Sequence, residues 1–554
     1  MSPVQVPRPA SEAIASAIAA RDATIPPEYL LPKSFKLPKN PSGILESSGL
    51  LSAGELAIVN LDATGLAGQI ASGTVTSVQA TAAYIKAAAL AQQATNCLVE
   101  LFAAEALERA AFLDAELAAG RNHGAFHGVP VSIKDHIDVK GHDSPSGFLS
   151  FVGKMVAEED AHLVRILRDA GAVFYCKTTN PQSLMHLETD SYLGLTSCPF
   201  NTALSSGGSS GGEGAIIGFR ASPLGVGADI GGSVRSPAAN CGIYSFKPSV
   251  GRLPNMGMVY PIGPKGYEGI LGTHAPMGRS VRDMELYMRV FAAAQPWLRE
   301  PGVEVKPWRE VERKAKLRIG VLYDDGVVRP VAPVRRALDV AVAKLKAAGH
   351  DVVEFTPFKS AENWSLIVGD QCRDVTPADI SQSKLYWPEN GAMVRRHLAN
   401  SGEPMRPLTE WIISQAGNKE RTWAELTALA AQRDYFRYDF GVYWHQAGVD
   451  VVLSPVGPTP APEHGTAKYW NYTSYWNLTN YPAGVFPTGL SVDPALDAED
   501  GSYAPRNDSE TFVYDNYDAE VSVDAPICLQ VIGFLGLEEE TLSAMGTIVD
   551  VVQK

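Results

Sequence analysis

The sequence predicts an α/β fold, because segments with helical periodicity alternate with short apolar segments typical of strands. The observations are a pair of Ala-rich helices between residues 76 and 119, a strand-helix-strand pattern over 128–175, and a β-α-β pattern over 317–355. The 554 residues, 45% of them hydrophobic, supply enough apolar material for a large core.

The helical pair has clear ends. Thr76 and Gln79 fit a capping box, which predicts a helix from Thr76 to about Ala94. A second helix is expected over 104–119, with Gly120 just past its end in the position where a left-handed residue is favoured.

The next segment, G-V-P-V-S-I-K at 128–134, alternates apolar with small or polar residues. We therefore expect a strand that is half buried on one face and that ends at Lys134. Leu163, Ile166 and Leu167 then mark one face of a helix that ends by Gly171, before an extended segment at 173–175.

The later β-α-β pattern consists of L-R-I-G-V-L-Y, a helix opened by Pro333 and closed by Gly349, and D-V-V-E-F. The first 45 residues differ from both regions because prolines interrupt them repeatedly. They are expected to form an extended arm over the body of the protein.

Composition limits the kind of partner. A formal net charge of −14 opposes tight binding to nucleic acid or anionic lipid, so we expect a small-molecule partner. No unbroken apolar segment resembles a signal peptide or reaches 18 residues, which favours a cytoplasmic protein with no membrane contact. The six cysteines are far apart and are expected to be reduced thiols.

Glycine is concentrated between 205 and 251. Glycine-rich backbone can approach a ligand closely and direct several N–H groups at one point. A phosphate site is disfavoured, because neither G-x-G-x-x-G nor G-x-x-x-x-G-K-[ST] occurs in this region. The histidines also lack metal-site spacing with cysteine or carboxylate partners, so we expect no metal and no cofactor.

Three motifs resemble the amidase signature family: P-V-S-I-K-D at 130–135, G-G-S-S-G-G-E-G-A at 207–215 and D-I-G-G-S-V-R-S-P-A at 229–238. The resemblance implies one large domain with a central twisted mixed sheet covered by helices on both sides. It implies a catalytic domain over 76–554, with the signature core at about 125–255 and a more variable β-α-β and helical region at about 300–445. Residues 1–75 would form an N-terminal arm and helices packed on that body.

The resemblance also implies a Ser-Ser-Lys triad, in which Ser233 forms an acyl-enzyme and Ser209, after a cis peptide bond, links it to Lys134. The implied oxyanion and substrate-binding groups are those of Ile230, Gly231, Gly232, Ser233 and Ser209. Supporting roles would fall to three neighbours of these residues: Ser210, Asp229 and Arg235.

Elementary chemistry agrees with these roles. A serine hydroxyl needs a base, and a lysine can act as one only when its pKa is low enough to leave it partly neutral. Lys134 at the end of an apolar strand, below a glycine-rich loop, is a candidate for such burial.

A rival interpretation takes G-G-S-S-G at 207–211 as a nucleophile elbow. Ser209 would then be the nucleophile, with His445 or His464 as its base. This interpretation leaves Lys134 and the 229–238 motif without a role. A scaffold that has kept the fold but lost activity is disfavoured, because all three triad positions are present.

The N-terminal I-P-P-E-Y-L-L-P and the K-T-T-N-P-Q-S-L-M-H-L-E-T-D segment are most similar to soluble fungal-type acetamidases and general amidases. The expected reaction converts a primary carboxamide, aliphatic or aryl, to acid and ammonia. Hydrolysis of carbamates, or of a broad range of amides, anilides and esters, is an alternative. An ammonia-supplying subunit of an amidotransferase is an alternative of another class.

In the same family the segment after the K-T-N-P-like element lines the acyl pocket, which points to Leu184, Met185 and Leu187. The helical spacing of Leu184 and Leu187 fits ordinary core packing equally well. Membrane-bound fatty amide hydrolases are disfavoured for lack of a spanning segment, and a homodimer is a possible assembly.

Overall fold

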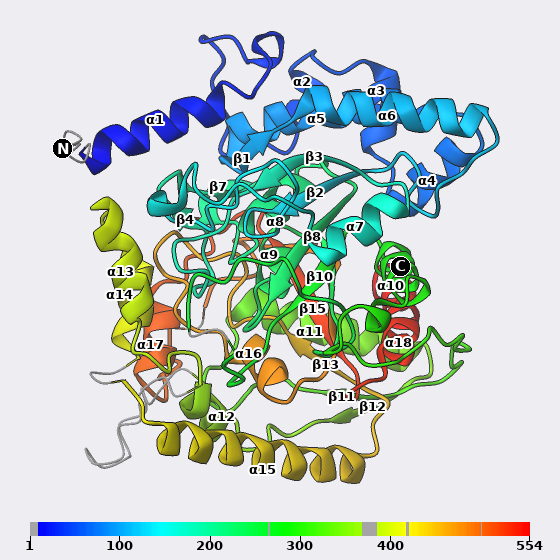
Figure 1. Ribbon diagram of the computed structural model, residues 1–554. Helices are drawn as coiled ribbons and strands as arrows, with labels where there is room; N and C mark the ends of the chain where they lie inside the picture. The colour runs from blue at the N-terminus through cyan, green and yellow to red at the C-terminus, as the bar shows by residue number, and fades with distance from the viewer. Residues whose placement is uncertain (1–8, 264–265, 368–384, 417–419, 500) are drawn as a thin grey trace.

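The computed structural model describes residues 9–263, 266–367, 385–416, 420–499 and 501–554 (Figure 1). Within these residues eleven strands form one mixed sheet in the order β1-β3-β2-β8-β10-β9-β14-β15-β13-β11-β12. The strands of this sheet are β1 (Leu98–Leu101), β2 (Pro130–Lys134), β3 (Val173–Thr178), β8 (Leu224–Asp229), β9 (Tyr244–Lys247), β10 (Thr273–Gly278), β11 (Arg318–Val321), β12 (Asp351–Glu354), β13 (Val451–Pro455), β14 (Ala483–Ser491) and β15 (Pro526–Ile532). Two small hairpins consist of β4 (Asp190–Ser191) with β5 (Gly194–Leu195), and β6 (Ser197–Cys198) with β7 (Asn201–Ser205).

Helices surround this sheet. They are α1 (Ala10–Asp22), α2 (Ile44–Ser47), α3 (Ala53–Val59), α4 (Ala63–Ala71), α5 (Ser77–Thr95), α6 (Ala103–Ala118), α7 (His162–Asp169), α8 (Gly211–Gly218), α9 (Arg235–Asn240), α10 (Val281–Ala293), α11 (Ala332–Ala347), α12 (Ser360–Ile367), α13 (Ala392–Ser401), α14 (Pro407–Ser414), α15 (Trp423–Ala447), α16 (Asn471–Leu478), α17 (Asp508–Asp515) and α18 (Glu538–Val552), with short 3-10 turns η1 (Pro27–Tyr29), η2 (Leu149–Phe151) and η3 (Pro296–Leu298). Helices α8, α9 and α16 cover one face of the sheet, and α10, α11 and α18 cover the other. The predicted α/β class, with helices on both sides of a mixed sheet, is confirmed.

Most of the predicted elements are present. Thr76 caps α5 with the expected box, Gly120 beyond α6 has φ +76°, and β11 pairs in parallel with β12 across α11. The strand predicted at 128–134 is β2, but all of its residues are buried, not half of them. The reason is its central place between β3 and β8, where helices cover both faces.

The N-terminal segment corrects a second expectation. Residues 10–22 form the helix α1 and not an extended arm. Its apolar residues pack against Leu149, Tyr192 and Leu193, and the buried Arg21 donates from Nη1 to the Leu98 carbonyl on β1 at 3.2 Å. The prolines that suggested an extended chain follow the helix and so do not interrupt it.

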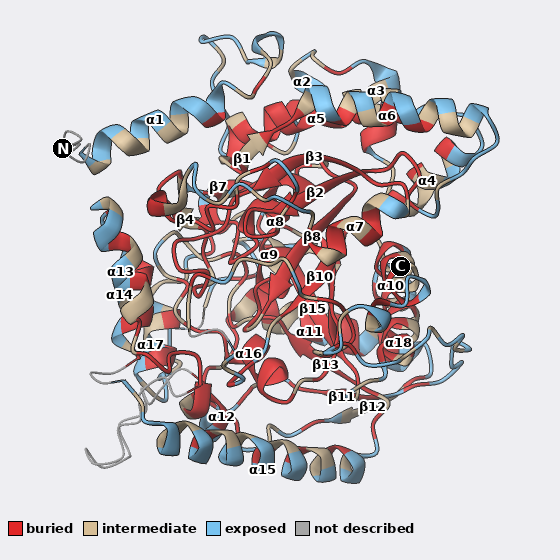
Figure 2. Cartoon of the chain, in the orientation of Figure 1, coloured by how far each residue is buried: buried red, intermediate tan, exposed pale blue. Residues whose placement is uncertain are grey.

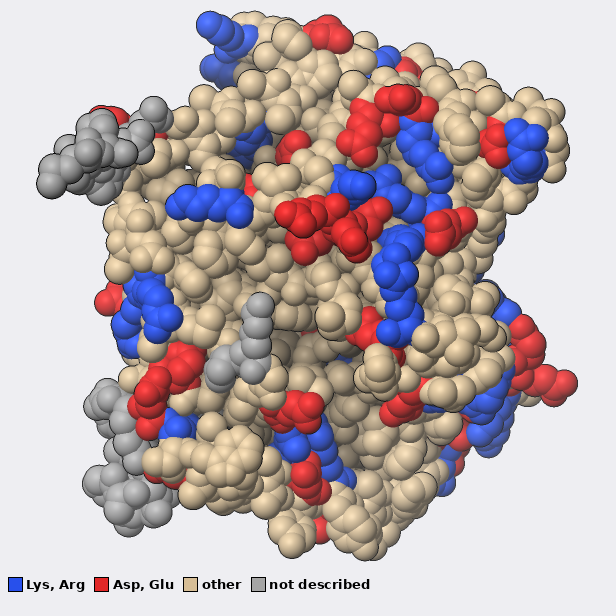
Figure 3. All heavy atoms as spheres, in the orientation of Figure 1, with Lys and Arg blue, Asp and Glu red and all other residues tan. Residues whose placement is uncertain are grey.

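Buried residues are concentrated around the sheet, whereas α1 and α15 lie at the edges with exposed outer faces (Figure 2). On the face shown in Figure 3, acidic and basic side chains are interspersed among uncharged residues and do not separate into large zones of one sign. No helix of the described residues combines the length and apolar character that a membrane crossing needs.

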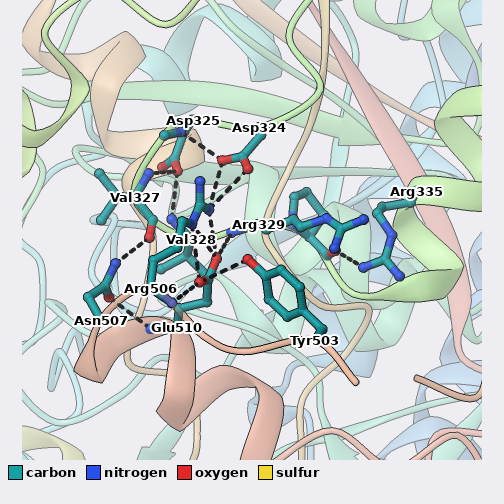
Figure 4. Close-up of polar contacts among 12 residues, drawn as sticks. Asp324, Asp325, Val327, Val328, Arg329, Arg335, Tyr503, Arg506, Asn507 and Glu510 are labelled. Carbon is teal, nitrogen blue, oxygen red and sulfur yellow. Dashed lines mark hydrogen bonds and ion pairs between the residues drawn. The ribbon is translucent and has the colours of Figure 1, made fainter. Parts of the chain in front are cut away.

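A polar cluster joins the loop after β11 to the start of α17 (Figure 4). Arg506 forms ion pairs with Glu510 at 2.6 Å and with Asp324 at 3.0 Å, and Glu510 also accepts a hydrogen bond from the Arg329 amide. In the same loop, Asp325 accepts hydrogen bonds from Tyr469 and from Asn471 at the start of α16. The cluster therefore fixes the surroundings of α16, a helix whose side chains contact residues 229–231.

Candidate active site

Lys134 is the last residue of β2, and its side chain is completely buried between neighbouring strands and the glycine-rich loop. Its Nζ lies 2.7 Å from the Ser209 Oγ. Burial lowers the pKa of Lys134 to about 7, although the negative charges of Asp229, Asp135 and Glu213 act in the opposite direction. A substantial fraction of this amine is therefore neutral near neutral pH and able to accept a proton.

Ser209 lies in the loop between β7 and α8, after a cis Gly208–Ser209 peptide bond that agrees with the expectation from the sequence. Gly208 is needed there because a Cβ would lie 2.7 Å from the backbone of Glu188 and His186. The next residue, Ser210, donates its backbone N–H to the Ser233 carbonyl at 3.0 Å. The loops on either side of the α8–β8 unit are thereby joined directly.

Ser233 lies in the turn between β8 and α9. A buried ion pair holds the backbone of this turn. Arg235 and Asp229 are both fully buried and lie 3.0 Å apart. Burial alone would raise the pKa of Asp229, but Arg235, Lys247 and hydrogen bonds from its neighbours hold it below the ordinary value. The carboxylate accepts the backbone N–H groups of Gly232 at 2.9 Å and Val234 at 3.2 Å. These bonds fix the backbone on both sides of Ser233.

The same bonds separate the four expected oxyanion donors into two groups. The Gly232 N–H is directed at Asp229 and is already engaged. Among the described residues, the N–H groups of Ile230, Gly231 and Ser233 have no acceptor. These three amides are available for a developing negative charge beside Ser233.

Side chains of α16 hold the turn between β8 and α9 in place. The sequence had not indicated these residues. Asn477 donates to Asp229 at 2.9 Å, and Thr473 donates to the Gly231 carbonyl at 2.8 Å. Arg235 also bonds the Thr473 carbonyl and the Asn477 side chain. The sequence N-L-T-N-Y-P-A-G at 477–484 resembles a later core segment of the amidase signature family, but this resemblance does not indicate what the Asn477 side chain contacts.

A cavity of about 530 Å³ brings Lys134, Ser209 and Ser233 together. Its walls are mostly apolar, and among the described lining residues Lys134 is the only cation. The remaining wall is formed chiefly by these side chains: Leu253, Met256, Met258, Tyr260, Ile262, Tyr267, Ile270, Leu271, Leu385 and Tyr386. The space suits an apolar group considerably larger than acetyl.

The three residues suggested for the acyl pocket divide between two places. Leu184 and Met185 line this cavity, whereas Leu187 lines a separate cavity of about 60 Å³ with Ser236 and Asn240. Leu184 and Leu187 do not lie on a helix, as their spacing had allowed. The segment forms turns, and Leu184 has φ +60°.

His136 also lines the cavity. The sequence did not indicate this role, because His136 belongs to no recognised motif. Its Nδ1 lies 3.1 Å from the Val259 carbonyl, which only accepts, so this nitrogen bears the proton. The Nε2 is buried and has no partner among the described residues. Burial and the nearby Lys134 lower the pKa of His136 well below its ordinary value, so the ring stays neutral and Nε2 remains an acceptor.

The histidines of the rival nucleophile elbow lie elsewhere. The His464 Nε2 is 3.3 Å from the Ser197 Oγ, and His445 lies on α15 with its ring against Phe534. The Ser209 hydroxyl instead accepts a hydrogen bond from the Lys134 amine. The geometry therefore offers a lysine, not a histidine, as the base for this serine.

Within the described residues no group of three or more His, Cys, Asp or Glu side chains is arranged to hold a metal ion. The five cysteines of this part of the chain are free and buried, and Cys372 lies outside the described residues.

Comparison with known proteins identifies relatives of the whole chain. A family model described as Amidase matches residues 79–542. An acetamidase of Emericella nidulans is 36% identical over 538 residues, which cover 94% of each protein. An acetamidase of Aspergillus oryzae is 35% identical over 539 residues, which cover 94% of this chain and 95% of that protein.

A solved structure titled fatty acid amide hydrolase superposes with a TM-score of 0.91 at 34% sequence identity. The match covers 98% of this chain and 95% of that one. The likeness therefore includes the elements that surround the cavity as well as the sheet.

Proposed function

This chain belongs to the amidase family and is a hydrolase of non-peptide carbon–nitrogen bonds in amides, and we propose that Ser233, Ser209 and Lys134 perform the reaction as nucleophile, relay and base. One observation carries the proposal. A buried lysine with a pKa of about 7 contacts Ser209 at 2.7 Å, in a cavity that Ser233 also lines.

In the acylation step, the Ser233 Oγ attacks the amide carbonyl carbon while its proton passes to the Ser209 Oγ and the Ser209 proton passes to the neutral Lys134 amine. The carbonyl oxygen becomes an oxyanion beside the amides of Ile230, Gly231 and Ser233. Collapse of this intermediate breaks the C–N bond, and the leaving nitrogen takes the proton from Lys134 through Ser209. The products are ammonia, or an amine, and an ester of Ser233.

Deacylation repeats the relay with water. A water molecule attacks the ester carbonyl and gives up one proton through Ser209 to Lys134. The second tetrahedral intermediate then expels the Ser233 oxygen, which regains that proton. The carboxylic acid leaves, and the three residues return to their starting protonation states.

We propose carboxamides with an apolar acyl group as the substrate class. The two acetamidases favour a primary amide as the reacting group, whereas the cavity volume of about 530 Å³ favours acyl groups longer than acetyl. The similarity to a fatty acid amide hydrolase supports the larger acyl groups. Acyl groups with a free carboxylate are disfavoured, because the described wall offers no cation apart from Lys134.

Carbamates are a second candidate, because their carbonyl carbon accepts the same attack and forms the same oxyanion. The apolar cavity would then hold the alkoxy group. An ammonia-supplying subunit is a candidate of another class, and it requires a partner to receive the ammonia.

The test is release of ammonia by the purified protein from acetamide, hexanamide, benzamide, ethyl carbamate and glutamine. We expect hydrolysis of the apolar amides, and a loss on the order of 10³ or more in kcat for Ser233→Ala. Ser245→Ala is a matched control, because this buried hydroxyl has no hydrogen-bond partner in the part of the chain that the structure describes and lies on β9 outside the cavity.

Full activity of Ser233→Ala would refute the proposed nucleophile. Preference for ethyl carbamate would select the second candidate. Activity on glutamine alone would favour the ammonia-supplying role.

A further inference from the structure

The peptide unit that joins Ile230 to Gly231 is held at its carbonyl end. This carbonyl oxygen accepts a hydrogen bond from the Tyr386 hydroxyl at 2.6 Å, whereas the N–H of the same unit, on Gly231, has no acceptor among the described residues. A trans peptide is planar, so the C=O and the N–H of one unit point in opposite directions. The direction of the Gly231 N–H therefore depends on the side chain that holds the Ile230 carbonyl.

The neighbouring peptide units are held differently. In the unit that follows, Thr473 donates to the Gly231 carbonyl at 2.8 Å and the Gly232 N–H is engaged by the buried carboxylate, so both ends are occupied. The unit that carries the Ser233 N–H is held at its carbonyl by the backbone N–H of Ser236 at 2.8 Å. The Ser233 amide is thus oriented by the backbone that follows it, whereas the Gly231 amide relies on a side chain from a distant segment.

The turn needs such a hold at this position. Gly231 has no Cβ, so steric contacts only weakly restrict its φ rotation, which turns the preceding peptide unit. The Tyr386 hydroxyl also lies against Gly231 itself, because a Cβ on this glycine would come within 2.9 Å of the hydroxyl oxygen. The tyrosine and the turn are therefore in direct contact, and a side chain at position 231 would displace the hydroxyl.

The environment of Tyr386 suits this role. The residue is 7% exposed, and it forms part of the cavity wall. Burial raises the pKa of the Tyr386 phenol above its ordinary value, so the hydroxyl remains a hydrogen-bond donor at neutral pH. A hydrogen bond to a peptide carbonyl also polarises the unit and strengthens the N–H at its other end as a donor. The hydroxyl therefore both orients the Gly231 amide and makes it a better donor.

We propose that Tyr386 is a positioning residue for the oxyanion, acting through the peptide unit between Ile230 and Gly231. The inference rests on the proposed function, in which Ser233 attacks the amide carbonyl and the Gly231 N–H is one of three available donors. As the substrate oxygen becomes negative, a correctly directed N–H stabilises the transition state more than it stabilises the bound substrate. Loss of the Tyr386 hydroxyl should therefore slow turnover without weakening the binding of the acyl group.

Tyr386→Phe removes this hydroxyl and keeps the ring in the cavity wall. We expect kcat on hexanamide to fall by about 10-fold, less than the loss on the order of 10²–10³ that follows removal of an oxyanion donor, while KM changes by less than about 2-fold. Tyr175→Phe is the matched control. This buried phenol donates to the Ala221 carbonyl at 2.5 Å, before β8 and not after it, and the variant should keep the kcat of the parent.

Two reversible inhibitors separate positioning from a change in the shape of the cavity. Hexanal accepts the Ser233 Oγ at its carbonyl carbon, while the serine proton passes through Ser209 to Lys134 and the aldehyde oxygen becomes an oxyanion. Hexan-1-ol fills the acyl cavity but has no carbonyl. In Tyr386→Phe the inhibition constant of hexanal should rise by about the factor by which kcat falls, and that of hexan-1-ol should stay unchanged. Equal weakening of both inhibitors, or of neither, would overturn the proposed role.

A double variant checks the contact independently. In Gly231→Ala the new methyl group displaces the hydroxyl, so kcat should fall as it does in Tyr386→Phe. The loss should be no deeper in Gly231→Ala/Tyr386→Phe, because both changes remove the same hydrogen bond. Losses that multiply in the double variant would contradict the proposal.

Ser233→Ala, measured alongside, distinguishes failure of the proposed function from failure of this inference. Full activity of Ser233→Ala would overturn the proposed nucleophile, and the role of Tyr386 with it. An inactive Ser233→Ala together with parent-like kinetics of Tyr386→Phe would overturn only the role of Tyr386.

Discussion

Arg235 donates two hydrogen bonds to the carboxylate of Asp229, from Nε at 3.1 Å and from Nη2 at 3.0 Å, and no part of either side chain is exposed. The pair lies directly beneath the turn that presents Ser233. It links the proposed nucleophile to the stability of the fold, because removing one charge of the pair leaves the other buried without compensation.

Asp229→Asn should therefore lower the free energy of unfolding by about 3–5 kcal/mol, as is usual when one member of a buried pair is lost. The Gly232 amide would also lose its anionic acceptor, so kcat should fall. Urea denaturation and steady-state kinetics measure the two effects. Asp351→Asn is the control, because it breaks the half-exposed pair with Arg318 and should cost less than about 1 kcal/mol. A loss no larger than that of the control would contradict the structural role.

The pKa of Lys134 predicts the pH profile of the reaction. Since the proposed base, Lys134, must be neutral and its pKa is about 7, kcat/KM should rise with pH through about 7 and then reach a plateau. A profile that rises near the ordinary lysine value of 10.5 would show that Lys134 is not the base. Tyr438→Glu, which changes a surface residue outside the cavity, should keep the midpoint of the parent.

The same burial predicts a dependence of stability on pH. Lys134 and Lys247 both have a pKa of about 7 when folded and 10.5 ordinarily, so the unfolded chain binds more protons between these values. The free energy of unfolding should therefore rise as pH rises through this window, and fall as pH falls through it.

Lys134→Met removes one of these two lysine contributions, so the stability of this variant should depend less steeply on pH. Denaturation curves measured across the window compare the two slopes. Parallel curves for the parent and the variant would refute the linkage.

His136 should select acyl groups that carry a hydrogen-bond donor. Its neutral Nε2 is a buried acceptor, and leaving such a group unmatched costs about 1–3 kcal/mol. Ratios of kcat/KM for benzamide and its hydroxyl-bearing isomers measure the preference. In His136→Phe the preference for the best hydroxylated isomer should disappear, whereas activity on benzamide should remain. An unchanged ratio would show that this nitrogen does not meet the substrate.

Met185 and Leu187 provide a test of the cavity wall. Met185→Ala enlarges the space around the acyl group, so kcat/KM should shift toward branched or longer amides. Leu187→Ala removes a residue outside this cavity and should leave the order of substrates unchanged. The assignment of the cavity to the acyl group fails if the two variants alter the order equally.

Local patterns were sufficient for much of the fold. The capping box at Thr76 and Gln79, and the β-α-β unit that contains α11, depend on interactions within a few turns of chain. Burial of β2 and the helical state of α1 depended on partners far away in the sequence. The apolar alternation in β2 could not show that β3 and β8 would lie on both sides of it.

The sequence by itself determined the chemical groups of this protein. They are a lysine at the end of a strand, two serines in glycine-rich loops, and Asp229 and Arg235 on either side of Ser233. Only the tertiary structure decided that Lys134 contacts Ser209, that the Gly232 amide is already engaged, and that Leu187 lies outside the cavity. Residue types and spacing are properties of short segments. Burial, a shifted pKa and an unpaired Nε2 on His136 arise from segments that meet only when the chain is folded.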